Sequence, residues 1–314
     1  MKIMHQLTAF RLHHLPAATL LVLLTIPSIQ CTKSGSSNSS TSKGTSGALL
    51  SKEVLVAADA SGSTVDSMVT NYQYDGNNNV NGLQQSSLVT VSGAMITTSV
   101  SYSMTYSGNL ISGLTGTINE TVSSGIVNVS ASTQVSTSFQ SSGGHVVSYV
   151  QKATTTGSPL VPFTPETAND SVLLTYDGSG NISSLTVYQI NPATNAYALN
   201  STETFTFSGG NLATTVVVAY AGGTATDTFT TDYSYDGKNS AAPNYIFPGI
   251  AIVNVNNLTK TSQTETGVNP GSVVTTYTTT YNSANQPATS QATVATTPTS
   301  SGLIATENIT YTYQ

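Results

Sequence analysis

Apolar and polar residues alternate along much of this chain with a period of two. Segments 277–281 (YTTTY), 205–207 (FTF), 233–235 (YSY) and 311–313 (YTY) place aromatic side chains at one parity and hydroxyl side chains at the other. Because successive side chains of a β-strand point to opposite faces, this pattern predicts strands with an aromatic face and a hydroxyl face. We expect the aromatic face to be covered.

The segment 172–185 (VLLTYDGSGNISSL) shows how these strands are joined. One strand ends at Tyr176, the Asp177-Gly178 pair predicts a tight turn with positive φ at both central positions, and a second strand starts at Ile182. Asp-Gly between two apolar, β-branched runs is a strong signal for a hairpin. The segment therefore predicts a β-hairpin.

The same sequence motif recurs about eight times, roughly every 32 residues, and a unit of this length is enough for two strands and two connections. The aromatic residue before each turn marks the repeat: Tyr74, Tyr106, Phe139, Tyr176, Phe207, Tyr235, Tyr281 and Tyr313. About 16 strands in one open sheet would be wider than such sheets are before they curl or split. We predict an all-β, consecutive antiparallel meander curled into a flattened barrel, a half-shell or a sandwich, with a solenoid as the alternative. The Pro-containing stretches 157–170 and 238–257 are expected to be crossing loops or irregular insertions.

The charge of the chain limits the classes of molecule that it can bind. Only 7% of the residues are charged, and the part after position 31 keeps 6 of the 8 basic residues and all 14 acidic ones, a balance of about −8. Nucleic-acid binding needs a basic surface, so it is excluded as a function class. An outer-membrane barrel is disfavoured, because its lipid-facing side must be apolar and the Thr/Ser face is not.

The N-terminal residues predict an export signal. Residues 1–30 carry basic residues, then a short apolar run, and they precede Cys31, which is the chain's only cysteine. This arrangement resembles the lipobox of bacterial lipoproteins, which implies lipid attachment at Cys31; the alternative is ordinary secretion with Cys31 as a bystander. We predict a signal peptide in 1–30, a lipidated cysteine with a flexible Ser/Gly linker in 31–50, and a β-repeat domain in 51–314. The resemblance implies a lipid anchor in the outer membrane, on its periplasmic side.

The repeat itself resembles a known family. Tyr176-Asp177 with Gly180-Asn181 behind it, together with 74–76 (YDG) and 235–237 (YDG), is similar to the tyrosine-aspartate, or RHS-like, repeats. The chain looks most like β-repeat lipoproteins of unknown function in Gram-negative envelopes. This resemblance implies a fold type and no established activity.

Few residues suggest catalysis or metal binding. After the leader the chain has one histidine, His145, whereas a Ser-His-Asp triad also needs a carboxylate that holds the histidine. Asp75, Asp177 and Asp236 recur at one repeat position, which suggests either calcium or, more simply, turn formation. Glu203 and Asp232 are a carboxylate pair that a hydrolase could use only if both faced one cleft. We predict no catalytic residue, no metal site and no cofactor.

The repeat tyrosines remain as candidate binding residues. Tyr74, Tyr176, Tyr235 and Tyr281 would contact a ligand if they lay along one exposed groove; otherwise they form the core. The leading hypothesis is a tethered, non-enzymatic module with a structural or interaction role at the outer membrane, and the alternative is a glycan-binding or adhesive module. Its partners would be the membrane, through the lipid anchor, and an envelope protein or a glycan. With aromatics inward, Tyr176→Ser should destabilise the fold by several kcal/mol, as loss of a buried aromatic does, and Asp66→Asn should be nearly silent.

Overall fold

The computed structural model describes residues 49–59, 64–91, 94–124, 127–157, 166–191, 194–239, 244–247, 250–252, 254–267, 270–297 and 304–313. Within these ranges every regular element is a β-strand. The predicted leader, Cys31 and most of the linker lie outside the described residues. No described segment is a helix long and apolar enough to cross a membrane.

The strands are β1 (Leu50–Asp59), β2 (Thr64–Tyr74), β3 (Val80–Val91), β4 (Ala94–Ser107), β5 (Leu110–Ser124), β6 (Val127–Ser142), β7 (His145–Gly157), β8 (Glu166–Tyr176), β9 (Ile182–Ile190), β10 (Tyr197–Ser208), β11 (Asn211–Ala221), β12 (Thr224–Asn239), β13 (Asn244–Phe247), β14 (Ile250–Ile252), β15 (Asn256–Thr266), β16 (Gly271–Tyr281), β17 (Pro287–Thr297) and β18 (Ile304–Tyr313).

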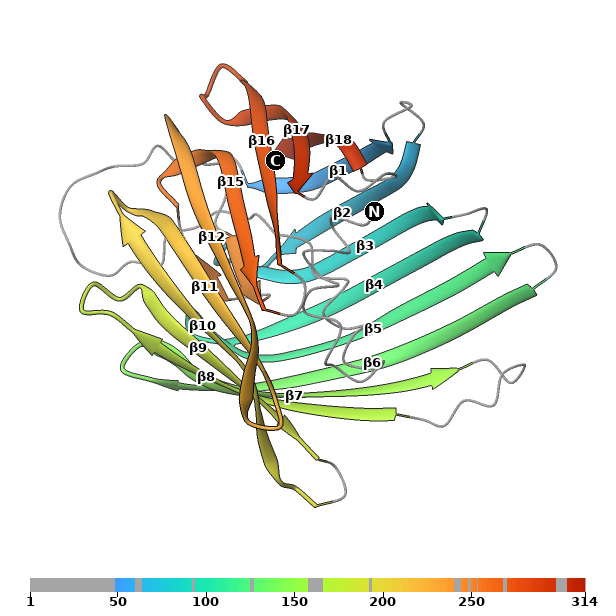
Figure 1. Cartoon of the computed structure of the whole chain (residues 1–314), viewed down its shortest axis with the longest axis vertical. Helices are drawn as coiled ribbons and strands as arrows, with labels where there is room; N and C mark the ends of the chain where they lie inside the picture. Colours follow the sequence, from blue (N-terminus) through green and yellow to red (C-terminus); the bar gives the residue numbers. More distant parts are fainter. Residues whose placement is uncertain are drawn as a thin grey trace.

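Sixteen of these strands form one closed barrel (Figure 1). Each strand pairs antiparallel with its neighbour in the chain, β12 pairs with β15 across the insertion, and β18 closes the barrel on β1. The predicted meander of about 16 strands is confirmed, and of the three predicted shapes the structure adopts the barrel. Closure pairs every edge strand, which removes the exposed edges that an open sheet would leave.

Two predicted loop regions contain strands. In 157–170, β8 begins at Glu166, because Ala168 pairs with Ala153 and extends the ladder to β7. In 238–257, β13 and β14 form a separate two-stranded sheet. The predicted start of the repeat domain at residue 51 lies one residue after the first residue of β1, Leu50.

The inner face of the barrel carries the apolar core. Its largest cluster of buried residues comes from β1 through β11 and includes Leu83, Ile111, Leu114 and Ile118, each with at most 2% of its surface exposed. The predicted inward position of the aromatics is confirmed, since the repeat aromatics of β2, β4, β6, β8 and β10 pack against this cluster. One glycine of β5 is needed for this packing. Gly116 pairs with Tyr102, whose ring occupies the space that a Cβ of residue 116 would take.

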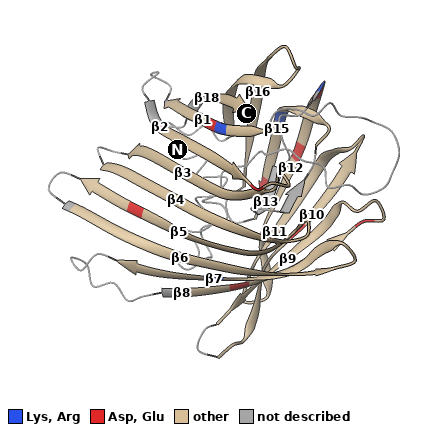
Figure 2. Ribbon diagram, turned by 180° about the vertical axis from the view of Figure 1, so that it is seen from behind, with Lys and Arg blue, Asp and Glu red and all other residues tan. Residues whose placement is uncertain are grey.

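The outer face of β4 to β6 carries mostly hydroxyl and amide side chains, and exposed apolar side chains on the outer face include Leu88, Met95 and Leu173. Along the three longest neighbouring strands, the outward positions are Ser99, Ser101, Ser103 and Thr105 on β4, Thr115, Thr117, Asn119 and Thr121 on β5, and Ser130, Ser132, Gln134, Ser136 and Ser138 on β6. Charged residues are sparse on the barrel (Figure 2). Side chains that hydrogen-bond to water therefore cover this part of the wall.

The Asp-Gly turns differ from the predicted primed type. Gly180 donates to the Asp177 carbonyl at 3.0 Å, and positive φ occurs at Gly180 (83°) but not at Gly178. This is a three-residue loop with a type I turn followed by a left-handed residue. The Asp177 carboxylate selects it by accepting hydrogen bonds from the backbone of Ser179 at 2.8 Å and of Asn181 at 2.9 Å. Primed-type positive φ at two successive residues occurs instead at the Gly-Gly turns, for example 58° and 80° at Gly209 and Gly210.

Candidate functional site

The repeat tyrosines lie on the inner face, at the end of the barrel where the Asp-Gly turns are. Four of them donate a hydrogen bond from the phenol hydroxyl to a backbone carbonyl of an earlier strand. The pairs are Tyr74 with Leu50 at 2.7 Å, Tyr106 with Val80 at 2.8 Å, Tyr176 with Val146 at 2.7 Å, and Tyr313 with Pro287 at 2.9 Å. Each bond ties one hairpin to the preceding strand pair. Burial of the ring raises the pKa of Tyr176 to about 12.

Tyr235 and Tyr281 have different partners. The Tyr235 hydroxyl donates to Asn254 Oδ1 at 3.3 Å, and the Tyr281 hydroxyl donates to Asp236 while accepting from Asn257 Nδ2 at 2.9 Å. These bonds hold the ends of the insertion that contains β13 and β14. The four candidate ligand contacts, Tyr74, Tyr176, Tyr235 and Tyr281, are thus all part-buried and hydrogen-bonded within the protein. Ligand contact by them stays a prediction, and any such ligand would have to reach the inner face.

The turn carboxylates act locally. Asp75 repeats the arrangement of Asp177: it accepts from the backbone of Asn77 and Asn79, each at 2.8 Å, and from Asn79 Nδ2 at 3.0 Å. Hydrogen bonds from Asn181 and the turn backbone lower the pKa of the exposed Asp177 carboxyl. Turn formation therefore accounts for Asp75 and Asp177, whereas Asp236 lies within β12 and accepts from the backbone of Lys238 at 2.8 Å and from the Tyr281 hydroxyl. The described residues contain no group of three or more His, Cys, Asp or Glu side chains placed to hold a metal ion.

The candidate catalytic residues do not come together. His145 stacks on Tyr176, with ring centroids 4.3 Å apart, at the turn end of the barrel. Glu203 shares the inner face of β10 with the buried Phe205, whereas Asp232 is exposed on the outer face of β12 and accepts from Thr214 Oγ1 at 3.0 Å. The wall of the barrel separates Glu203 from Asp232, so this pair forms no common cleft.

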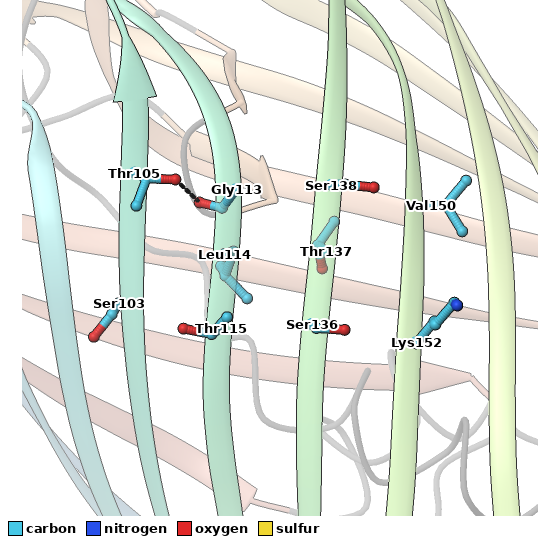
Figure 3. Close-up of a pocket in the computed structure, with 10 residues that line it drawn as sticks. All are labelled: Ser103, Thr105, Gly113, Leu114, Thr115, Ser136, Thr137, Ser138, Val150 and Lys152. Atoms are coloured by element: carbon cyan, nitrogen blue, oxygen red, sulfur yellow. Dashed lines mark hydrogen bonds between the residues drawn. The ribbon is translucent and has the colours of Figure 1, made fainter.

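A hollow of about 310 Å³ lies on the wall across β4 to β7 (Figure 3). It is lined by Ser103, Thr105, Gly113, Leu114, Thr115, Ser136, Thr137, Ser138, Val150 and Lys152. Gly113 contributes no side chain, and its carbonyl accepts from Thr105 Oγ1 at 3.4 Å. The lining offers hydroxyl groups and one ammonium group for hydrogen bonds to a polar molecule, and it includes neither a carboxylate nor an imidazole for acid-base chemistry.

A pair of tyrosines outside the repeat pattern is accessible. Tyr197 is 63% exposed, and its ring meets that of Tyr188 edge to face with centroids 6.3 Å apart. Tyr188 pairs across the sheet with Ser171 and Leu199 on the outer face. The sequence analysis missed this pair because it considered only tyrosines next to the repeated turn motif, and segment 188–197 (YQINPATNAY) does not contain that motif.

The inner face also carries carboxyl groups that sequence reasoning did not single out. We call them the inner carboxylates; they share strand parity with, or pair directly opposite, buried apolar residues, and they are Glu53, Asp66, Glu120, Asp170, Glu203, Asp227, Glu265 and Glu307. Burial raises the pKa of Glu53 to about 7 and the pKa of Asp66 to about 6. The expectation that Asp66→Asn is nearly silent loses its basis, because Asp66 is buried. The sequence contains a signal for this position, because Asp66 is an even number of residues from Tyr72 and Tyr74 and therefore lies on the same face of the strand.

No protein-family model matches the chain, and no curated protein matches it. The solved structures that are similar in fold include two porin-like proteins. One is a porin-like protein from Bacteroides uniformis, with 12% identity over 84% of this chain and 98% of that one and a TM-score of 0.49. The other is a porin-like protein from Bacteroides vulgatus, with 14% identity, the same two coverages and a TM-score of 0.46. At these values the likeness carries no conclusion about activity, and the predicted relation to tyrosine-aspartate repeats stays a prediction.

Proposed function

We propose that this chain is a non-enzymatic envelope module: a β-barrel that stands in water beside the outer membrane and is held there by lipid on Cys31. The observation that carries the proposal is the distribution of side chains between the two faces of the wall. A barrel that spans a bilayer needs an outward apolar band about 25 Å tall. Here nearly all outward positions of β4, β5 and β6 carry Ser, Thr, Asn and Gln, with the exposed Met95 as an apolar exception.

The inner face completes this argument. Aliphatic and aromatic side chains cluster on it from β1 to β11, so the hydrophobic effect there acts toward the inside. The polar wall at β4 to β6 gains nothing from lipid around it, although outward apolar side chains such as Leu88, Leu173 and Val216 occur on other strands. We therefore propose that membrane association depends on the N-terminal segment. Thr32 to Ala48 is rich in Ser and Gly, which suits a flexible connection between an anchored Cys31 and a barrel that begins at Leu50.

Fractionation of cells that express the full chain tests the proposal. We expect wild type in the membrane fraction, resistant to alkaline carbonate and labelled by an alkyne-tagged fatty acid. Cys31→Ala should be exported, unlabelled and released by washing, whereas the matched variant Thr32→Ala should behave as wild type. If the Cys31→Ala protein resists carbonate extraction, the barrel itself is embedded and the proposal is wrong.

Glycan binding is the second candidate, and Tyr188 with Tyr197 favours it. An exposed aromatic face can stack on a sugar ring, and the preceding residues Asn191, Thr194 and Asn195 supply polar groups beside it. We expect any glycan bound at this pair to be lost with Tyr197→Ala and retained with Tyr235→Phe. Binding that survives Tyr197→Ala would contradict this candidate.

A further inference from the structure

The hollow across β4 to β7 opens on the outer face of the wall. Thr115 and Ser136 line it with exposed side chains at outward positions of their strands. Gly113, which has no side chain, pairs with Thr105 on one side and with Ser138 on the other, so there is a gap between those two side chains. The volume of about 310 Å³ is at the small end of the range for ligand pockets, roughly 300–1,000 Å³. The hollow therefore offers open space for one part of a polar ligand.

Two rows of directly paired residues cross the hollow (Figure 3). Neighbours in a row come from adjacent strands and lie side by side on the outer face, about 5 Å apart. The first row is Thr105, Gly113, Ser138 and Val150, and the second row is Ser103, Thr115, Ser136 and Lys152. The ladder pairs these residues without a register shift between them, so the strand pairing itself holds the hollow in shape.

Beyond β7 both rows continue across the outer face and end at the exposed tyrosine pair. The first row continues through Ser171 to Tyr188, and the second row continues through Asn169 and Ile190 to Tyr197. Three strand spacings separate β7 from β10, a distance of about 14 Å at 4.8 Å per strand. A short oligosaccharide lying across the strands can therefore contact both the hollow and the tyrosine rings.

The lining of the hollow selects the charge of such a ligand. On β4 to β7 the described Lys, Arg, Asp and Glu residues are Glu120, which is an inner carboxylate, and Lys152, which is exposed on the outer face and lines the hollow. A phosphate group is usually held by several cationic or backbone N–H groups. One ammonium group among hydroxyl groups instead matches one carboxylate on a molecule that carries many hydroxyls. A uronic acid has this chemistry.

The far end of both rows presents aromatic rings. Tyr197 is 63% exposed, and its ring meets that of Tyr188 edge to face. An exposed aromatic ring can stack on the C–H face of a sugar ring, and the half-buried Val150 gives the hollow a small apolar surface for the same kind of contact. The two rows thus join a cationic, hydroxyl-lined hollow to an aromatic pair on one face of the barrel.

We infer that the outer face from β4 to β10 binds a short oligosaccharide of uronic acids, with one carboxylate beside Lys152 and one sugar ring on Tyr197. This inference rests on the glycan-binding candidate and deepens it, because it names the acidic class of the glycan and adds a second contact region. It does not depend on the lipid anchor.

Isothermal titration calorimetry with an acidic oligosaccharide and its uncharged ester tests the inference. The protein is the full chain with Cys31→Ala, which avoids detergent, and the probes are tetragalacturonate and its complete methyl ester at pH 7 and low salt. We expect saturable binding of the acid and roughly fivefold weaker binding of the ester, which is the size of one exposed ion pair. Lys152→Gln should weaken binding of the acid to the level of the ester and leave binding of the ester unchanged.

Three further variants separate this site from general attraction. Tyr197→Ala should weaken binding of both probes roughly tenfold through loss of the ring. Ser138→Leu should weaken binding of both because the larger side chain fills the hollow. Lys260→Gln removes an exposed lysine of β15 and should leave binding of both unchanged. All these positions are exposed, so the variants should fold, which far-ultraviolet circular dichroism checks.

The outcomes distinguish failure of this inference from failure of the candidate on which it rests. Equal binding of the acid and the ester that is still lost in Tyr197→Ala would overturn the inference and leave glycan binding at the tyrosine pair in place. Absence of saturable acid binding, or acid binding that Lys152→Gln leaves unchanged, would also overturn the inference.

Discussion

The two faces of the barrel wall are built from the same strands and have opposite chemistry. On β3, Leu83 is 1% exposed while its neighbour Gln84 is exposed, and on β4, Tyr102 is buried between the exposed Ser101 and Ser103. Apolar packing stabilises the inner face at these positions, whereas the neighbouring outward side chains are polar. The comparison teaches that position along the strand, more than residue type, decides what a substitution costs.

The largest expected difference is between adjacent residues on opposite faces. Leu83→Ala should lower the free energy of unfolding by roughly 2–5 kcal/mol, because it leaves a cavity in the inner cluster. Gln84→Ala should change it by less than about 0.5 kcal/mol. Urea denaturation of the two variants measures both. Equal effects would show that the inner cluster does not carry the stability.

The buried carboxyls of Glu53, Asp66 and Asp170 should make the protein less stable as pH rises. The pKa of Glu53 is raised from 4.5 to about 7 by burial, so the folded state holds this proton more tightly than the unfolded state. Its contribution is complete below pH 4.5 and is lost as pH passes through about 7. At pH 8, Glu53→Gln should therefore raise the free energy of unfolding by about 3 kcal/mol.

Denaturation of wild type and Glu53→Gln at pH 5 and pH 8 checks this. The variant should flatten the pH dependence but not abolish it, because Asp66 and Asp170, each with a pKa of about 6, titrate as well. Asp232→Asn on the outer face is the matched control and should retain the wild-type dependence. A stability that rises from pH 5 to pH 8 would contradict the assignment.

The repeat tyrosines allow the inner and outer faces to be compared through the loss of a single hydrogen bond. Tyr176→Phe keeps the ring and removes the bond to the Val146 carbonyl, which should cost roughly 0.5–1.5 kcal/mol of unfolding free energy. Tyr197→Phe on the exposed pair should cost close to nothing. Thermal unfolding of the two variants tests the difference, and a silent Tyr176→Phe would mean that this bond does not tie the hairpins together.

Substitutions in the turns are expected to change the free energy of unfolding least. The turns set the register of the hairpins and so keep each side chain on its own face. Gly180 has a φ of 83°, so Gly180→Ala should destabilise by about 1 kcal/mol. Gly178→Ala should be neutral, since φ at Gly178 is not positive and a Cβ there meets nothing within 4 Å. A primed Asp-Gly turn would reverse this order, because Gly178 would then be the strained position. Thermal unfolding distinguishes the two.

Much of the fold could be predicted from the alternation of apolar and polar residues and from the recurring turn motif. These local signals depend on neighbouring residues, so they indicated the hairpins, the strand count and the inward side of Tyr72 and Tyr74. The turn type was predicted wrongly, because the hydrogen bonds of the Asp177 carboxylate to Ser179 and Asn181 outweigh the preference of Asp-Gly for a primed turn.

The candidate site was predicted less well. The alternation that places the tyrosines on the inner face also places Asp66 and Glu307 there. Charged residues are usually on surfaces, so the alternation was not applied to these two carboxylates. The exposed pair of Tyr188 and Tyr197 depends on how β9 and β10 pair beyond the repeat phrase. Tyr hydroxyl bonds such as Tyr176 to Val146 join residues 30 positions apart, which no local pattern specifies.

The sequence by itself determined the alternation, the hairpins and the chemistry of each face, because these follow from neighbours along the chain. Only the tertiary structure decided that the meander closes, since the pairing of Glu53 with Tyr311 and of Ala57 with Glu307 joins the first strand to the last. Closure depends on how strand twist and register add up over 16 strands, and it alone brings Asp66 and Glu307 to either side of Ala57.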